Sequence, residues 1–292
     1  MKSLMTHAVK LQVINVLPPF PKFKTIDKPR SWFSKTDYNK LHNFVRTNIG
    51  KVYEVKQGTK QLVRRVKITE EIYDLILQKY KPDNLDIDIE LKKNFHLDKS
   101  KNHYTQVTNL EELMTVINAG FTNFSFETSV SDKYQIKKTN MTVKENYNNI
   151  NNMLLFLDDS PLRNYNTRLY VNCITKCPIE GNIIINKVVD ELVKLHQLRP
   201  NKICLVDECG ELKPVQLFNI YEGLLYNKID LSKFSMQFHV KPESEEEVEK
   251  LFHLALDYGV KEFNVSALNM YHYMPYHMYY KFLFNYINKK CD

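Results

Sequence analysis

The feature that most constrains the fold is an alternation, from residue 51 onward, of short β-type runs with longer runs of helical periodicity. The helical runs place apolar residues at steps of three and four, as in Ile68, Ile72, Leu75 and Ile76. The predicted strands are 52–55, 85–91, 103–107, 122–127, 166–173, 202–207, 233–240 and 261–266. The predicted helices are 68–80, 111–118, 143–157, 186–197, 215–226, 245–258 and 272–289.

This alternation predicts the fold class. Strands that alternate with helices form βαβ units, so we expect an α/β protein with a parallel sheet. Eight strands are the number of a closed (β/α)8 TIM barrel, which we expect over residues 51–292. An open doubly wound sheet is the alternative, but it would use a glycine-rich first turn, which this sequence lacks.

The N-terminal segment differs from the rest of the chain in its charge. Residues 1–50 contain nine Lys or Arg and two Asp, which accounts for the whole formal net charge of +7. Pro18, Pro19 and Pro21 disfavour a helix there. We therefore predict that 1–50 is a basic N-terminal extension or strap. It could contact an acidic partner or nucleic acid, although no nucleic-acid-binding motif accompanies it. Alternatively, it covers the barrel with its lysines in water.

Composition excludes several classes of protein. Hydrophobic residues make up 43% and charged residues 26%, as in a globular protein. No apolar run reaches about 18 residues, so we expect no membrane contact through a spanning helix. Five cysteines are too few for a disulfide scaffold and favour a reducing compartment, which we expect to be the cytoplasm. Abundant Asn, Lys, Ile and Tyr, which have AT-rich codons, suggest an AT-rich genome such as that of a large DNA virus, with the host cytoplasm as the compartment.

The alternation within the strand at 234–240 indicates which side chains face the barrel interior. Phe234, Met236 and Phe238 share one face and are expected to pack outward on helices. Gln237 and His239 share the other face and are expected to point inward near the carboxyl end of the strand. Barrel enzymes carry their sites at that end.

Acidic residues are expected to reach the same mouth. In the strand at 85–91, Asp86, Asp88 and Glu90 alternate with apolar residues and should point inward. Asp207 and Glu208 end the sixth predicted strand. Carboxylates that lose water need partners, a metal or a wet mouth, so these residues are candidates for a site.

Two further patterns have simple structural readings. Ser244 and Glu247 predict a capping box at the start of the helix at 245–258, so the acidic run there is not assigned as a metal site. Cys173 and Cys177 have a three-residue spacer and lack a second pair, so we expect reduced thiols rather than a zinc site, which stays the alternative. Cys209 lies beside acidic residues, which should raise its pKa.

Several segments, in order, resemble the 3-hydroxy-3-methylglutaryl-CoA (HMG-CoA) lyase family. YVNCITKCPIEG (170–181) is similar to the fifth-strand motif of that family, and SDKYQIKKTNMTVKEN (131–146) to a preceding segment. Asn109 stands in TNLEEL where the family has a similar asparagine. CLVDECGELKP (204–214) and FSMQFHVKPES (234–244) parallel the sixth and seventh strands.

The resemblance implies a TIM barrel that cleaves HMG-CoA to acetoacetate and acetyl-CoA. A divalent cation, Mg²⁺ or Mn²⁺, would polarise the substrate oxygens, and an acyl-CoA would be the ligand. This sequence departs from the pattern at the residues that carry the chemistry. Gly58 and Thr59 stand where the family has Arg and a metal-binding Asp. Gln237 replaces the first histidine of the seventh strand, and only His239 remains. The loop at 267–273 lacks the family's glycines and cysteine.

Carried over to this chain, the resemblance and the strand faces give candidate catalytic, substrate-binding and metal-binding residues. They are Asp207 and Asp88 as catalytic residues, Asn109, Asn140 and Gln237 as substrate-binding residues, and His239 and Asp207 as ligands of any surviving metal.

Because the metal ligands and the enolate-stabilising Arg are missing, we predict a degenerate lyase-like barrel with a binding or structural role and no cofactor. The alternative is an active metal-dependent acyl-CoA or oxo-acid carbon–carbon lyase with a rearranged site at the barrel mouth. A third hypothesis is an interaction protein that forms homo-oligomers and uses the 1–50 extension and the tyrosine-rich helix at 272–289.

Overall fold

The sheet curls into half of a barrel. The computed structural model describes residues 53–57, 61–65, 73–74, 77–78, 82, 84–86, 102–160, 164–241, 243–266 and 273–291. Seven parallel strands form the main sheet, and their order in space follows their order in the chain. The strands are β3 (Asn84–Asp86), β4 (Asn102–Gln106), β5 (Asn123–Ser129), β6 (Asn166–Asn172), β9 (Lys202–Asp207), β10 (Phe234–Phe238) and β11 (Glu262–Asn264).

The order of the strands decides between the two predicted architectures. Each new strand joins the same growing edge, so β6 is the middle strand and β3 and β11 are the two edges. In a doubly wound sheet the order of the strands reverses at one point, because later strands join the opposite edge. The strand order of this sheet does not reverse. The winding is therefore that of a TIM barrel. The described residues form an open arc, and they do not close it into the complete barrel that was expected.

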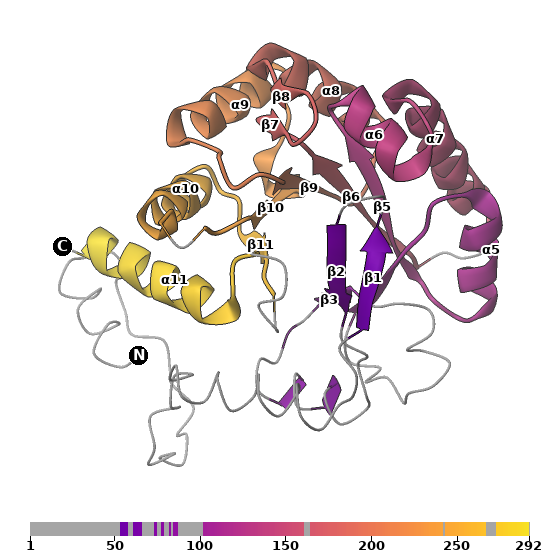
Figure 1. The fold of residues 1–292 in the computed structure, drawn as a ribbon, viewed down its shortest axis with the longest axis horizontal. Helices are drawn as coiled ribbons and strands as arrows, with labels where there is room; N and C mark the ends of the chain where they lie inside the picture. The colour runs from indigo at the N-terminus through magenta and orange to yellow at the C-terminus, as the bar shows by residue number, and fades with distance from the viewer. Residues whose placement is uncertain are drawn as a thin grey trace, which may run out of the picture.

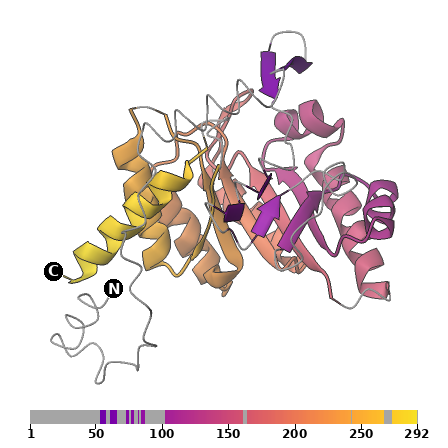
Figure 2. The same ribbon diagram turned by 90° about the horizontal axis from the view of Figure 1, so that it is seen from below.

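The predicted first barrel strand, 52–55, is wrong in its pairing. It falls in β1 (Tyr53–Gln57), which pairs antiparallel with β2 (Gln61–Arg65) in a separate two-stranded sheet. A three-residue connection that contains Gly58 favours a hairpin over a crossover to a parallel neighbour. Figure 2 shows this hairpin projecting beyond the seven-stranded sheet. The expected basic extension, 1–50, lies outside the described residues.

The helices cover the convex side of the arc (Figure 1). They are α5 (Leu110–Asn118), α6 (Asp132–Thr139), α7 (Val143–Asp159), α8 (Ile185–Gln197), α9 (Pro214–Tyr226), α10 (Glu245–Asp257) and α11 (Tyr276–Cys291). Most match the predicted ranges within a few residues, and positions 73–74 and 77–78 of the predicted helix 68–80 are helical. No helix in the described ranges is both long and apolar enough to cross a membrane.

Helix α6 has no counterpart among the predicted helices, because its caps rather than its apolar pattern define it. The Ser131 hydroxyl accepts a hydrogen bond from the backbone N–H of Tyr134 at 3.1 Å. Asn140 ends the helix in the left-handed region at φ 58°, and its N–H donates to the carbonyl of Ile136 at 2.8 Å. Asparagine tolerates this conformation better than most side chains do.

The predicted capping box at Ser244 is also wrong. The Ser244 hydroxyl accepts from the N–H of Lys241 at 2.9 Å and donates to its carbonyl at 3.1 Å, so it closes a turn instead of capping α10. A capping box does form at the start of α7. There the Glu145 carboxylate accepts from the N–H of Thr142 at 2.7 Å, and the Thr142 hydroxyl accepts from the N–H of Glu145 at 3.2 Å.

The hydrophobic core lies between the helices and the convex face of the sheet. Phe124 and Phe126 of β5 and Phe234, Met236 and Phe238 of β10 are completely buried there. This confirms the outward face predicted for 234–240. Because neighbours along a strand point to opposite faces, the alternate residues of the same strands line the concave face, which is largely polar.

Aromatic packing attaches the last helix to the end of the sheet. Phe252 of α10 is completely buried. Its ring centroid lies 4.2 Å from that of Phe263 in β11, and 5.6 and 5.8 Å from those of Tyr279 and Phe282 in α11. These four rings join β11, α10 and α11 into one packed unit.

Candidate functional site

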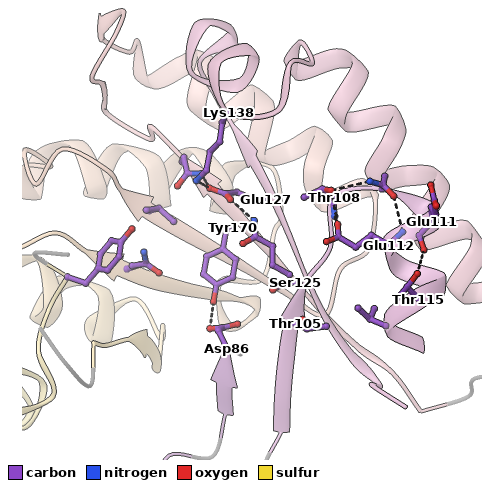
Figure 3. A pocket seen from close by; sticks show the side chains of 17 residues that line it. Asp86, Thr105, Thr108, Glu111, Glu112, Thr115, Ser125, Glu127, Lys138 and Tyr170 are labelled. Atoms are coloured by element: carbon purple, nitrogen blue, oxygen red, sulfur yellow. Dashed lines mark hydrogen bonds and ion pairs between the residues drawn. The ribbon is translucent and has the colours of Figure 1, made fainter. Parts of the chain in front are cut away.

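A cavity of about 850 Å³ opens on the concave face of the sheet and extends beside α5. Its described walls carry four carboxylates, one lysine and many hydroxyl and amide groups, and only Val116 and Val206 are aliphatic. Figure 3 shows two groups of residues around it. One group projects from the strands and includes Asp86, Ser125 and Tyr170, and the other lies along the start of α5.

Tyr170 of the middle strand β6 joins both edges of the sheet across the concave face. Its hydroxyl donates to Oδ2 of Asp86 on β3 at 2.6 Å and accepts from Nδ2 of Asn264 on β11 at 2.8 Å. Figure 3 shows the ring pointing toward Asp86. Burial, and next the Asp86 carboxylate, raise the pKa of Tyr170 well above its usual value. Tyr170 is therefore a hydrogen-bond donor at neutral pH and not a base.

Arg168, two residues earlier on β6, makes a second connection between the edges. Its Nη1 lies 3.5 Å from Oδ2 of Asp86, and its Nη2 lies 3.8 Å from Oε2 of Glu262 on β11. The guanidinium carbon lies 4.5 Å from the ring centroid of Tyr104 on β4. Only 4% of Arg168 is exposed, and its Nε has no hydrogen-bond partner in the described part of the chain. The buried Arg168 thus lies between two carboxylates, of which Glu262 also pairs with Lys202 at 2.7 Å.

Glu127 of β5 is the centre of a saturated polar cluster nearer the mouth. Its Oε1 accepts from Nδ2 of Asn172 at 2.5 Å and forms an ion pair with Lys138 of α6. Its Oε2 accepts from Nε2 of Gln106 at 2.7 Å. Both carboxylate oxygens therefore have partners within the protein, which hold Glu127 in the cavity wall.

Of the predicted metal-binding and catalytic residues, the structure describes Asp207 and His239, and both contact the loop that follows β9. Asp207 ends β9 and is 2% exposed, and its carboxylate accepts from the N–H groups of Glu211 and Leu212 at 3.2 Å each. Burial raises the pKa of Asp207, against the opposing effect of these hydrogen bonds. His239 follows β10, with Nδ1 2.5 Å from the carbonyl oxygen of Glu208 and its ring stacked on Tyr273 at 4.5 Å. Neither Asp207 nor His239 is among the described residues that line the cavity.

The described side chains do not by themselves assemble a site for a divalent cation. Within the described ranges, no three His, Cys, Asp or Glu side chains are placed to hold a metal ion together. The oxygens of Asp207 already hold the loop that follows β9, and Nδ1 of His239 faces a carbonyl. Asp88, Glu90, Gly58 and Thr59 lie outside the described residues, so the expected role of Asp88 stays a prediction.

The predicted substrate-binding residues separate into two groups. Gln237 and Asn109 line the cavity. Oε1 of Gln237 accepts from Nδ2 of Asn264 at 3.2 Å, which agrees with its predicted inward face. Oδ1 of Asn109 caps α5 by accepting from the N–H of Glu112 at 2.9 Å. Asn140 does not line the cavity, because it forms the left-handed end of α6.

Sequence reasoning missed Glu127, Arg168 and Tyr170, although a signal for them exists. In 122–127, Phe124 and Phe126 alternate with polar residues, and β10 shows the same two-residue period. Applying that period to β5 and β6 would have placed the three residues on the concave face. Asp86, in contrast, was expected to face inward, and it lines the cavity.

The described cysteines are free thiols, as expected, and three of them, Cys173, Cys177 and Cys204, are buried. Burial, and next the Asp207 carboxylate, raise the pKa of Cys209 to about 11. At pH 8 its thiolate fraction is then roughly two orders of magnitude below that of a free thiol with a pKa of about 8.5.

We therefore expect iodoacetamide to modify Cys209 at pH 8 about a hundred times more slowly than a model peptide thiol. Peptide mass spectrometry of the native chain over a time course measures this rate. The rate should rise steeply between pH 9 and pH 11. Labelling of Cys209 at the peptide rate at pH 8 would contradict the assigned environment.

Comparisons with known proteins agree with this architecture. No family model matches the sequence. The chain is 23% identical over 154 residues to the hydroxymethylglutaryl-CoA lyase YngG of Bacillus subtilis, which covers 52% of this chain and 49% of that protein. It is 26% identical over 121 residues to the cytoplasmic 3-hydroxy-3-methylglutaryl-CoA lyase of Rattus norvegicus, covering 41% of this chain and 34% of the relative. The chain thus matches at most about half the length of these relatives.

Solved structures show the same fold. The HMG-CoA lyase of Bacillus subtilis superposes with a TM-score of 0.60 and 20% identity, over 69% of this chain and 71% of that one. The lyase of Acinetobacter baumannii, solved in complex with coenzyme A and 3-methylmalate, has a TM-score of 0.53 and 19% identity, over 61% and 55% of the two chains. By sequence over about half of its length, and by fold, this chain is similar to HMG-CoA lyases.

Proposed function

We propose that this protein binds a small polar ligand on the concave face of its lyase-like sheet and has lost the family's metal-dependent carbon–carbon lyase activity. The observation that carries the proposal is the direction of the Asp207 carboxylate. It holds the N–H groups of Glu211 and Leu212 in its own loop and does not line the cavity. Gln237 stands where the resembled family has its first histidine, so this strand offers one imidazole, that of His239, in place of two.

The cavity itself supports a binding role. Its walls are held by hydrogen bonds between strands, such as Tyr170 with Asp86 and Gln106 with Glu127. Small-molecule sites are usually largely pre-formed, and the many polar groups of these walls suit a polar ligand. A ligand can therefore bind without a large rearrangement of the described walls.

An active acyl-CoA or oxo-acid lyase with a rearranged site is the second candidate. It is favoured by the Asp86 carboxylate and the protonated Tyr170 hydroxyl, which lie together in the cavity. These groups could exchange a proton with a substrate. An acyl-CoA ligand is also suggested by the coenzyme A complex of the Acinetobacter baumannii lyase, whose likeness to this chain concerns the fold.

Calorimetric titration of the purified, metal-stripped full chain with Mg²⁺ and Mn²⁺ tests the proposal. We expect no saturable heat up to millimolar metal and no acetoacetate from HMG-CoA, with the Bacillus subtilis lyase as the positive control. Saturable binding that Asp207→Asn and His239→Ala each abolish, but Glu246→Gln preserves, would show that a metal site survives. Glu246 is a suitable control because its side chain is 85% exposed and pairs only with nearby Lys250 among the described residues.

We also propose that residues 1–50 form an extension distinct from a barrel domain at 51–292. The concentration of the net charge in 1–50 supports this division. Limited trypsin digestion should cut first within 1–50, and early cuts spread through 102–160 would contradict the division. Gel filtration with light scattering would test the expected homo-oligomer.

A further inference from the structure

We propose that the cavity takes a small ligand that carries both hydroxyl groups and a positive charge, of the amino-alcohol or amino-sugar class, and not a CoA thioester. This inference rests on the proposed function, because it names the ligand of the same cavity. Three observations support it. Polar atoms on separate strands lack hydrogen-bond partners among the described residues, acidic residues outnumber basic ones in the described cavity walls, and the one lysine of these walls is already ion-paired.

The first observation is a set of polar groups that the protein leaves unused. Ser125 of β5 lines the cavity, is 2% exposed and makes no hydrogen bond through its hydroxyl within the described residues. The Ser125 oxygen is not one of the fully buried unpartnered atoms of the described residues, so it is open to the cavity and can exchange a hydrogen bond with a bound molecule. Figure 3 shows Ser125 on the same side of the sheet as Asp86 and Tyr170.

Asp86 offers a second unused atom. Its Oδ2 accepts from the Tyr170 hydroxyl and faces Arg168, and its Oδ1 has no partner among the described residues. The side chain is 46% exposed, so Oδ1 is accessible from the cavity. Arg168 lies on the Oδ2 side of Asp86, and Glu262 has a second cation in Lys202 at 2.7 Å, so the attraction for a cation comes from the excess of carboxylates in the described cavity walls. A free carboxylate oxygen and an unpartnered hydroxyl that line the same cavity can receive an ammonium group and a hydroxyl group of one ligand.

The charge of the walls disfavours a CoA thioester. Of the described lining residues, four are acidic, namely Asp86, Glu111, Glu112 and Glu127, and one is basic. That residue, Lys138, forms an ion pair with Glu127. The phosphates of CoA are recognised by arginine, lysine and helix N-termini. The one described helix start that lines this cavity, that of α5, carries Glu111 and Glu112 in its first turn, which oppose a phosphate. The same excess of carboxylates attracts a cationic ligand.

Isothermal titration of the full chain with matched ligand pairs tests the proposal. The pairs are serinol with glycerol and glucosamine with glucose, in which an amine replaces a hydroxyl. CoA and acetyl-CoA form the third arm. We expect at least one amine to bind about tenfold more tightly than its neutral partner, since a charge-assisted hydrogen bond is worth about 1.5–3 kcal/mol and a tenfold change about 1.4 kcal/mol. We expect CoA to show no saturable binding at millimolar concentration.

Variants locate the site. Asp86→Asn should remove most of the preference for the amine, and Ser125→Ala should weaken both members of a pair severalfold. Glu246→Gln should change neither. Should Asp86→Asn fail to fold by circular dichroism, the comparison of amine with neutral ligand on the unaltered chain still decides. Equal affinity within both pairs, no binding of either amine at about 10 mM, or tighter binding of CoA would each overturn the proposal.

The outcomes are separable from those of the proposed function. Binding of CoA without binding of Mg²⁺ would refute the ligand class but leave a metal-free binding protein. Saturable binding of Mg²⁺ together with a preference for amines would refute the loss of the metal site but support the ligand class.

Discussion

Replacing Phe252 with alanine is expected to lower the free energy of unfolding by about 3–5 kcal/mol, the usual cost of removing a buried phenylalanine side chain. The ring is completely buried and contacts Phe263, Tyr279 and Phe282, so its loss leaves a cavity where β11, α10 and α11 meet. Urea unfolding followed by circular dichroism measures the change. The urea concentration at the unfolding midpoint should fall, and the dependence of the unfolding free energy on urea concentration should change little.

Phe284→Ala is the matched control, because Phe284 lies on α11 and is 52% exposed. Its replacement should cost less than about 1 kcal/mol, since half of the side chain already contacts water. Equal losses for Phe252→Ala and Phe284→Ala would mean that α11 does not pack on the sheet as described.

Arg168→Met is expected to lower the free energy of unfolding by about 2–4 kcal/mol. Breaking a buried ion pair costs about 3–5 kcal/mol because the remaining charge loses its partner. We expect slightly less here, because the partner side chains Asp86 and Glu262 are 46% and 37% exposed and water screens them. Methionine keeps much of the buried stem, so the measured loss reports mainly the guanidinium group. Thermal and urea unfolding provide the measurement.

Arg168→Lys should lie between Arg168→Met and the unaltered chain. Lysine keeps the charge but cannot present two nitrogens to carboxylates on opposite edges or stack flat on Tyr104. A methionine variant at least as stable as the unaltered chain would show that the two carboxylates do not need this cation.

The periodicity of apolar residues predicted most of the helices and strands. It did not predict which strand β1 pairs with, nor which hydrogen bonds form at the start of α10. The apolar alternation of 234–240 gave the correct buried face of β10, because a one-residue error would expose Phe234, Met236 and Phe238. The same kind of pattern could not tell that 52–55 pairs with a neighbouring hairpin strand, since strand propensity carries no information about the partner. The start of α10 was predicted correctly at Ser244, but its hydroxyl found a closer partner in Lys241.

Strand alternation predicted which face some candidate residues share, but it carried no information about their hydrogen-bond partners. Strand ends place Asp207 and His239 at the mouth, but sequence position does not say where a side chain points. The turn after β9 presents two N–H groups to Asp207, and a buried carboxylate takes such donors in preference to facing a wet cavity. Gln237 and Asp86 were placed correctly because strand alternation alone fixes their face.

The two side chains of β6 that reach both edges of the sheet have a consequence for how the protein responds to a ligand. Tyr170 and Arg168 both contact Asp86 on the β3 edge. On the β11 edge, Tyr170 contacts Asn264 and Arg168 contacts Glu262. A cationic molecule that binds Oδ1 of Asp86 changes the charge that Oδ2 presents to Tyr170 and Arg168. Occupancy of the cavity and the strength of these contacts between the edges are then thermodynamically linked, and each shifts the other by the same free energy.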